Sequence, residues 1–141
     1  MAEVNLLKFV TEHIFLVALA AVSGTMLVWP AIRRTAGGSS ISTLQATLLI
    51  NQQNALVLDV REAAEYEKGH VLNARHLALG DLAARSADIE KYKARPVIVV
   101  CESGNRSEKA VAALRKMGFG QVFSLSGGIG AWRQAGLPLE K

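Results

Sequence analysis

The stretch that decides the fold is "PVIVVCESGNRSEKAVAALRKMG", residues 96 to 118, in which an apolar run leads through a polar loop into a helical pattern. Residues 96 to 100 are continuously apolar, and all of them after Pro96 are β-branched, as in a strand buried on both faces of a sheet. Residues 107 to 117 place apolar side chains on one helical stripe, which Gly118 ends. The stretch therefore predicts a strand, a loop and a helix in direct succession.

The same alternation continues on both sides of this stretch. Two more short apolar runs predict strands at residues 55 to 60 and 121 to 125. Helical patterns, the first of which opens with a Ser42 capping box, cover residues 42 to 53, 61 to 69, 80 to 92 and 127 to 136. Short apolar strands that alternate with helices indicate an α/β fold with an open, mainly parallel sheet covered on both faces.

The N-terminal third differs in composition. Residues 14 to 32 form a nearly unbroken apolar run, which as a helix is roughly 28 Å long, close to the ~30 Å hydrocarbon core of a bilayer. A cleaved signal peptide and a buried core helix are the alternatives, but a signal peptide has a basic start and a shorter apolar stretch. We therefore expect an N-terminal flank at 1–13, a transmembrane helix at 14–32, a flexible linker at 33–40 and a folded domain at 41–141.

Charges near the apolar run predict its orientation. Arg33 and Arg34 follow the run, whereas the segment before it is nearly neutral. The positive-inside rule then gives a single-pass protein of the inner (cytoplasmic) membrane with its C-terminal domain in the cytoplasm.

One cysteine excludes an intrachain disulfide and fits a reducing compartment. Thirteen Lys and Arg against ten Asp and Glu leave the domain at 41–141 with a charge of +3, which is too small and too scattered to indicate nucleic-acid binding.

That cysteine, Cys101, directly follows the apolar strand of the opening stretch, and in open α/β sheets ligands bind at the carboxyl ends of strands. The polar loop consists of Cys101, Glu102, Ser103, Gly104, Asn105 and Arg106. Gly104 and Asn105 tolerate unusual backbone angles, so several N–H groups can turn inward. The following helix N-terminus and the Arg106 charge favour a thiolate. A buried structural cysteine is the alternative, but this loop favours an activated nucleophile in an anion-binding cradle.

Three motifs, in this order, carry a resemblance to a known family. They are "LDVRE..EYEKGH" at residues 58 to 70, "PVIVVCESGNRS" at 96 to 107 and "GF.QVFSLSGGIGAW" at 118 to 132. Together they resemble a single-domain rhodanese, a thiosulfate sulfurtransferase-like module, over essentially all of residues 41 to 141. With its apolar N-terminal segment the chain is similar to small membrane-anchored bacterial members. The resemblance implies a rhodanese-like three-layer fold with a central, mainly parallel five-stranded sheet.

The resemblance makes Cys101 the sulfur carrier of a sulfurtransferase. Its thiolate would take sulfane sulfur from a donor such as thiosulfate or polysulfide, and an external thiol or protein acceptor would remove it, because no second cysteine exists. Backbone N–H groups of residues 102 to 106 would hold the persulfide. Asp59 and Arg61 match the family's "DVR" as supporting residues, with Arg61 expected to pair with Glu65 and Asp59 to orient loop backbone groups. No metal site and no cofactor are expected.

Several residues carry open alternatives. Arg106 either contacts the anion or forms a bridge to a carboxylate. His70 is expected to be a hydrogen-bonded structural histidine, and Asn73 replaces a family glycine at an expected left-handed position. Glu102 departs from the family pattern. A carboxylate beside the nucleophile opposes both formation of the thiolate and binding of dianionic thiosulfate.

Two other functions compete with sulfur transfer. The Cys-x4-Arg spacing is one residue shorter than the Cys-x5-Arg of dual-specificity phosphatases, so phosphatase or arsenate reductase activity is less favoured. A membrane-tethered binding module with little activity is the alternative from another class, because one fold serves many functions. Its partners would include other membrane proteins.

Overall fold

The chain divides between Gly38 and Ser39 into an N-terminal helical unit and a C-terminal α/β unit. A computed structural model describes the backbone of residues 5–37 and 39–141. The C-terminal unit begins two residues before the domain start predicted at residue 41.

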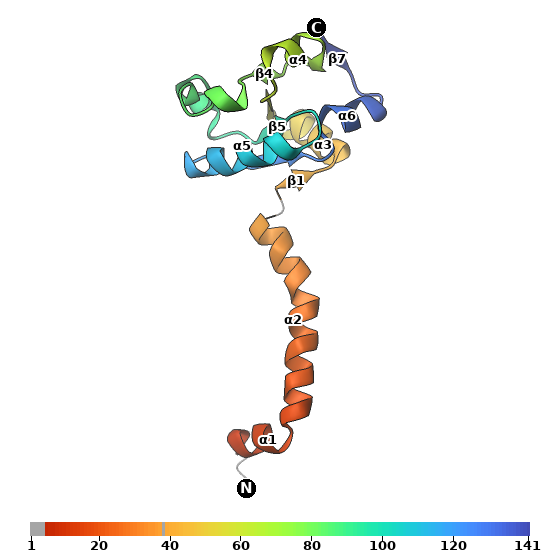
Figure 1. Ribbon diagram of the computed structural model, residues 1–141, viewed down its shortest axis with the longest axis vertical. Coiled ribbons are helices and arrows are strands. Elements are labelled where there is room, and N and C mark those ends of the chain that lie inside the picture. The colour runs from red at the N-terminus through yellow and green to blue at the C-terminus, as the bar shows by residue number, and fades with distance from the viewer. Residues whose placement is uncertain (1–4, 38) are drawn as a thin grey trace. The chain divides into compact units, whose positions relative to one another are not determined.

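The N-terminal unit contains helices α1 (Leu6–Glu12) and α2 (Ile14–Gly37) (Figure 1). In the part of the chain that the structure describes, no single helix is long and apolar enough to cross a bilayer; α1 and the Ile14–Trp29 part of α2 meet that requirement together, as a pair bent by 90°. α2 also continues through residues 33 to 37, so the linker predicted at 33–40 is wrong for these residues. Good helix formers follow the apolar run there, and the first glycine comes only at Gly37.

The C-terminal unit is built on a parallel five-stranded sheet with the strand order β1-β6-β5-β2-β4. In chain order its strands are β1 (Ser40–Ile41), β2 (Leu56–Asp59), β4 (Arg75–His76), β5 (Val97–Val100) and β6 (Val122–Leu125). A separate antiparallel pair joins β3 (His70–Val71) to β7 (Leu139–Glu140). The predicted five-stranded, mainly parallel sheet is confirmed.

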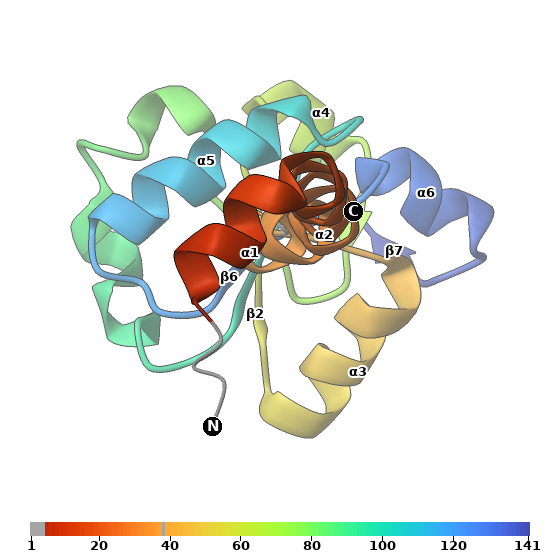
Figure 2. The same ribbon diagram turned by 90° about the horizontal axis from the view of Figure 1, so that it is seen from below.

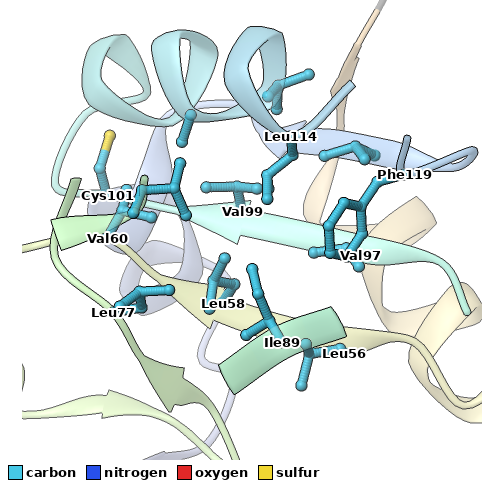
Figure 3. Close-up of a cluster of buried hydrophobic side chains, with 14 residues drawn as sticks. Leu56, Leu58, Val60, Leu77, Ile89, Val97, Val99, Cys101, Leu114 and Phe119 are labelled. Atoms are coloured by element: carbon cyan, nitrogen blue, oxygen red, sulfur yellow. The ribbon is translucent and has the colours of Figure 1, made fainter. Parts of the chain in front are cut away.

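Helices cover both faces of this sheet. They are α3 (Thr43–Gln53), α4 (Ala63–Glu67), α5 (Asn105–Lys116) and α6 (Gly128–Gln134), with the short 3₁₀ helices η1 (Leu79–Asp81) and η2 (Ser86–Tyr92). Successive strand residues point to opposite faces, so Leu58 and Val99 pack toward α5 and η2, while Val57 and Ile98 pack toward α3 and α6. Figure 2 shows α5 and α3 on opposite sides of the sheet, and Figure 3 shows the apolar cluster under α5.

Local patterns predicted the longer elements well. The capping box before α3 is present: the Ser42 hydroxyl accepts from the Gln45 N–H at 3.2 Å, and the Gln45 side chain accepts from the Ser42 N–H at 2.9 Å. Asn73 has the left-handed φ of 60° that was expected where the family has glycine. The helix predicted over 80 to 92 is wrong, because that segment forms two short 3₁₀ helices instead.

Candidate active site

Cys101 lies where β5 ends, and 1% of the residue is exposed. Gly104 adopts a left-handed φ of 111° and caps α5, which begins at Asn105, two residues earlier than the sequence predicted. The turn brings backbone donors to the sulfur: the Gly104 N–H donates to Cys101 Sγ at 2.9 Å, and the Ser107 N–H donates to it at 3.4 Å. Figure 3 shows the Cys101 sulfur at one end of the apolar cluster beside α5.

These donors set the acidity of the thiol. Burial raises the pKa of Cys101, but the hydrogen bond with the Ser107 side chain and the hydrogen bonds from the N–H groups of Ser107, Gly104 and Ser103 outweigh it, so the pKa lies below its ordinary value. A lowered pKa increases the thiolate fraction at neutral pH. Neutral hydrogen-bond donors in this loop therefore favour the thiolate form of Cys101.

A pair of buried serines supports the same sulfur, and sequence reasoning missed both roles. The Ser107 hydroxyl lies 3.6 Å from Cys101 Sγ and donates to the Gly104 carbonyl at 2.8 Å. It also shares a hydrogen bond of 2.6 Å with the Ser124 hydroxyl on β6. Both serines lie in the quoted motifs, Ser107 at the end of "CESGNRS" and Ser124 within "GF.QVFSLSGGIGAW", but the two motifs are distant in sequence, so their contact could not be predicted.

Arg106 forms the bridge to a carboxylate that was one of its two predicted roles. Its Nη1 and Nη2 donate to Glu65 Oε1 and Oε2 at 2.7 and 2.9 Å. These hydrogen bonds hold the pKa of Glu65 at about 2, below its ordinary 4.5, and Glu65 in turn raises the pKa of Arg106. The bidentate pair connects α4 to the first turn of α5. The Arg106 guanidinium therefore pairs with a carboxylate, and it also lies near Cys101.

Asp59 and Arg61 form a buried pair at the end of β2. Arg61 Nε donates to Asp59 Oδ1 at 3.0 Å, and Arg61 Nη2 donates to Asp59 Oδ2 at 2.8 Å and to the Gly69 carbonyl at 2.7 Å. The predicted pairing of Arg61 with Glu65 is wrong. α4 begins only at Ala63, so Arg61 lies outside the helix and its side chain turns inward. Asp59 Oδ1 also accepts the backbone N–H of Arg61 at 3.0 Å, so it orients a backbone group of this loop, as the sequence predicted.

Glu102 lies between two guanidinium groups. Its Oε2 is 3.4 Å from Arg61 Nη1, and its Oε1 is 3.5 Å from Arg133 Nη1 on α6. These cations offset the negative charge of Glu102. The sequence had predicted that this carboxylate opposes the thiolate, and it had indicated no cationic partner for it. Arg133 is a charged residue near the loop that the motifs did not suggest, because α6 follows the loop by more than twenty residues.

The start of α6 holds the loop by its backbone. The Ile129 N–H donates to the Cys101 carbonyl at 2.8 Å, and the Gly130 N–H donates to the Glu102 carbonyl at 3.4 Å. Gly128 has a φ of 58°, and a Cβ there would overlap the Cys101 carbonyl oxygen and lie 2.6 Å from that of Glu102. The glycine pair of the third motif therefore allows two backbones to approach closely.

Two further residues of the quoted motifs, His70 on β3 and Trp132 on α6, have structural roles. His70 Nδ1 is 3.0 Å from the Tyr66 carbonyl, and its ring stacks on Tyr66 with centroids 3.8 Å apart. This is the hydrogen-bonded structural histidine that the sequence predicted. Trp132 is buried against the α3 side of the sheet and donates through Nε1 to the Pro138 carbonyl at 3.0 Å.

A parallel α/β domain with a buried cysteine in a donor-rich loop, at the carboxyl end of a central strand, defines a class of proteins that use a cysteine nucleophile. The sequence model of the rhodanese-like domain matches residues 42–135, and the chain belongs to that family.

Known relatives agree with this membership. Thiosulfate sulfurtransferase GlpE of Pseudomonas fluorescens is 40% identical over 86 residues, which cover 60% of this chain and 75% of the relative. The protein YibN of Escherichia coli K12 is 35% identical over 137 residues, 96% of each chain, so that similarity runs through both units. Among solved structures, a rhodanese-related protein from Thermoplasma volcanium has a TM-score of 0.62 and 32% identity, covering 72% of this chain and 96% of its own. The family thus includes thiosulfate sulfurtransferases.

Proposed function

We propose that this protein is a membrane-anchored sulfurtransferase that carries sulfane sulfur as a persulfide on Cys101. The observation that carries the proposal is the Cys101 sulfur itself, which accepts N–H hydrogen bonds from Gly104 at 2.9 Å and from Ser107 at 3.4 Å in a family whose relatives include thiosulfate sulfurtransferases. Donors in this position stabilise a thiolate before the reaction and a persulfide anion after it.

The reaction occurs in two transfers. With thiosulfate as donor, the Cys101 thiolate attacks the outer sulfur, the sulfur–sulfur bond of the donor breaks, and sulfite leaves with the electron pair. An external thiol or other nucleophilic acceptor then attacks the outer sulfur of the persulfide and regenerates the thiolate. The acceptor comes from outside the chain, because the chain has one cysteine.

Phosphoryl transfer fits this loop less well. An arginine that served a tetrahedral phosphate would direct the fork of its guanidinium at the anion, whereas Arg106 directs both Nη atoms at Glu65. The short Cys-x4-Arg spacing agrees with that conclusion.

Membrane anchoring rests on the N-terminal unit. Residues 14 to 32 are apolar, and large side chains of α2 such as Phe15 and Leu27 are 86% and 82% exposed. Apolar surface of this extent is favoured in lipid over water. With Arg33 and Arg34 after the run, the proposal places the catalytic domain on the cytoplasmic side of the inner membrane. Release of the chain from membranes by alkaline carbonate, or protection of the domain from protease added on the cytoplasmic side, would overturn this part.

The sulfurtransferase proposal is tested by intact mass of the full-length chain in detergent. After incubation with thiosulfate or polysulfide, the wild type is expected to gain about 32 Da, one sulfur atom, and cyanide is expected to remove it. Cys101→Ser is expected to abolish the gain. If the wild type gains no sulfur from either donor or from a low-molecular-mass persulfide, sulfur transfer fails and the binding module becomes the favoured function.

A further inference from the structure

We propose that Glu102 and Arg133 form a binding site for the zwitterionic head group of an α-amino-acid thiol, so that an amino-acid persulfide such as cysteine persulfide exchanges sulfur with Cys101. The inference rests on the proposed function and names its small-molecule substrate. Arg133 binds the α-carboxylate, and Glu102 binds the α-ammonium group.

The charge arrangement of this pair matches the head group. The two side chains are half exposed, 48% for Glu102 and 47% for Arg133, and they present one negative and one positive group next to each other. Glu102 lies 3.5 Å from Arg133 and 3.4 Å from Arg61. Both distances are longer than the ~2.7–2.9 Å of a strong charge-assisted hydrogen bond. The carboxylate and the Arg133 guanidinium therefore keep hydrogen-bonding capacity for a ligand of opposite polarity.

The pair is also linked to the Cys101 loop, through the chain and through the backbone hydrogen bonds of α6. Glu102 directly follows Cys101, and α6 is held against both residues by the N–H groups of Ile129 and Gly130. Arg133 lies one helical turn beyond Ile129 and reaches back to Glu102. In cysteine persulfide the Cα is only a few bonds from the outer sulfur. A substrate of that size needs its charged groups recognised near the nucleophile, and Glu102 is the residue that follows Cys101 in the chain.

The other arginines around the loop are already engaged. Arg106 donates two hydrogen bonds to Glu65, and Arg61 is 1% exposed and bound by Asp59 and Gly69. Among the described residues at the loop, a dianion such as thiosulfate thus meets partly exposed arginines that each have a carboxylate partner, Arg106 with Glu65 and Arg133 with Glu102. A zwitterion gains from both members of the pair, so the site favours it over a dianion.

The transfer needs no oxidant or other reactant. The Cys101 thiolate attacks the outer sulfur of the donor persulfide, which carries the proton, and a new sulfur–sulfur bond forms. The bond between the two donor sulfurs breaks, and the amino-acid thiolate leaves with its electron pair. The same step in reverse delivers sulfur to an amino-acid thiol, so the head-group site serves donor and acceptor alike.

The test compares donors that differ by one charged group, using the full-length chain and the single-turnover loading of Cys101 followed by intact mass. The donors are cysteine persulfide, cysteamine persulfide, which lacks the carboxylate, 3-mercaptopropionate persulfide, which lacks the ammonium group, and thiosulfate. The wild type is expected to load from cysteine persulfide about fivefold more efficiently than from either truncated persulfide, the effect of one partly exposed ion pair.

The variants assign each preference to one residue. Arg133→Gln is expected to lose the preference over cysteamine persulfide but keep that over 3-mercaptopropionate persulfide, and Glu102→Gln is expected to show the opposite pattern with faster loading from thiosulfate. Arg133→Lys is expected to restore the carboxylate preference in part. Arg85→Gln and Glu90→Gln, which change exposed ion pairs of η2, are the matched controls and are expected to change none of these ratios.

The outcomes distinguish failure of the zwitterion site from failure of the proposed sulfur transfer. Equal loading from all three persulfides by the wild type, or variants that slow every donor by the same factor, would overturn the zwitterion site while sulfur transfer stands. Absence of loading from every donor, thiosulfate included, would overturn both.

Discussion

Replacement of Glu65 by Gln removes the carboxylate that holds Arg106 at the first turn of α5. The two hydrogen bonds of 2.7 and 2.9 Å join residues 41 positions apart, across α4 and the Cys101 loop. A fall in the pKa of Glu65 from 4.5 to about 2 corresponds to about 3 kcal/mol of favourable interaction in the folded state. Because about a third of each side chain is exposed, 34% for Arg106 and 32% for Glu65, solvent screening reduces the expected coupling to about 1–2 kcal/mol.

The pH dependence follows from the direction of the shift. The folded-state pKa of Glu65 lies below its ordinary value, so the folded state binds this proton less readily than the unfolded state. The stabilisation is therefore complete above pH 4.5 and is lost as the pH falls from 4.5 toward 2. For a domain of this size, about 1 kcal/mol corresponds to a change in Tm of roughly 4–8 °C.

The assay is a double-mutant cycle of urea unfolding on the full chain, with Glu65→Gln, Arg106→Gln and the double variant at pH 7 and pH 3. The coupling energy is expected to be about 1–2 kcal/mol at pH 7 and clearly smaller at pH 3. Glu90→Gln, which removes the exposed pair with Lys93, is the control and is expected to cost at most about 0.5 kcal/mol. A coupling near zero at pH 7, or one that is unchanged at pH 3, would refute the reasoning.

Two further changes test the Cys101 loop. Ser107→Ala removes a hydroxyl that lowers the pKa of Cys101, so the pH profile of alkylation by iodoacetamide is expected to move to higher pH; an unmoved profile would count against this role. Gly128→Ala places a Cβ against the carbonyl oxygens of Cys101 and Glu102 at a φ of 58°, and urea unfolding is expected to show a loss of at least about 2 kcal/mol. Gly120→Ala, which meets open space, is its control, and equal losses in the two variants would contradict the close approach.

The strand-loop-helix around Cys101 could be predicted because each part has a local signal. β5 is four consecutive buried residues, and α5 repeats apolar side chains at helical spacing. The elements that escaped prediction lack such a signal. β1, β3, β4 and β7 have two residues each, too few for any periodicity, and their pairing partners decide that they are strands.

The charged residues of the site show the same limit. Asp59, Arg61, Glu65 and Arg106 were all recognised, but the expected pairing of Arg61 with Glu65 assumed a helix that starts before residue 61. In the structure β2 and β5 are neighbours in the sheet, so the loops after them meet. Because these loops are adjacent, Glu65 pairs with Arg106, and Arg61 pairs with Asp59 and Glu102 instead.

By itself the sequence determined the alternation of strands and helices, the long apolar segment at residues 14 to 32, and the place of one cysteine at the end of a buried strand. These properties depend on spacing along the covalent chain. Only the tertiary structure decided the surroundings of that cysteine: the Ser107 and Ser124 hydroxyls behind the sulfur, and the two arginines on either side of Glu102. The partner of a charge or a hydroxyl is set by which strand ends lie side by side, and strand order is a property of the folded sheet.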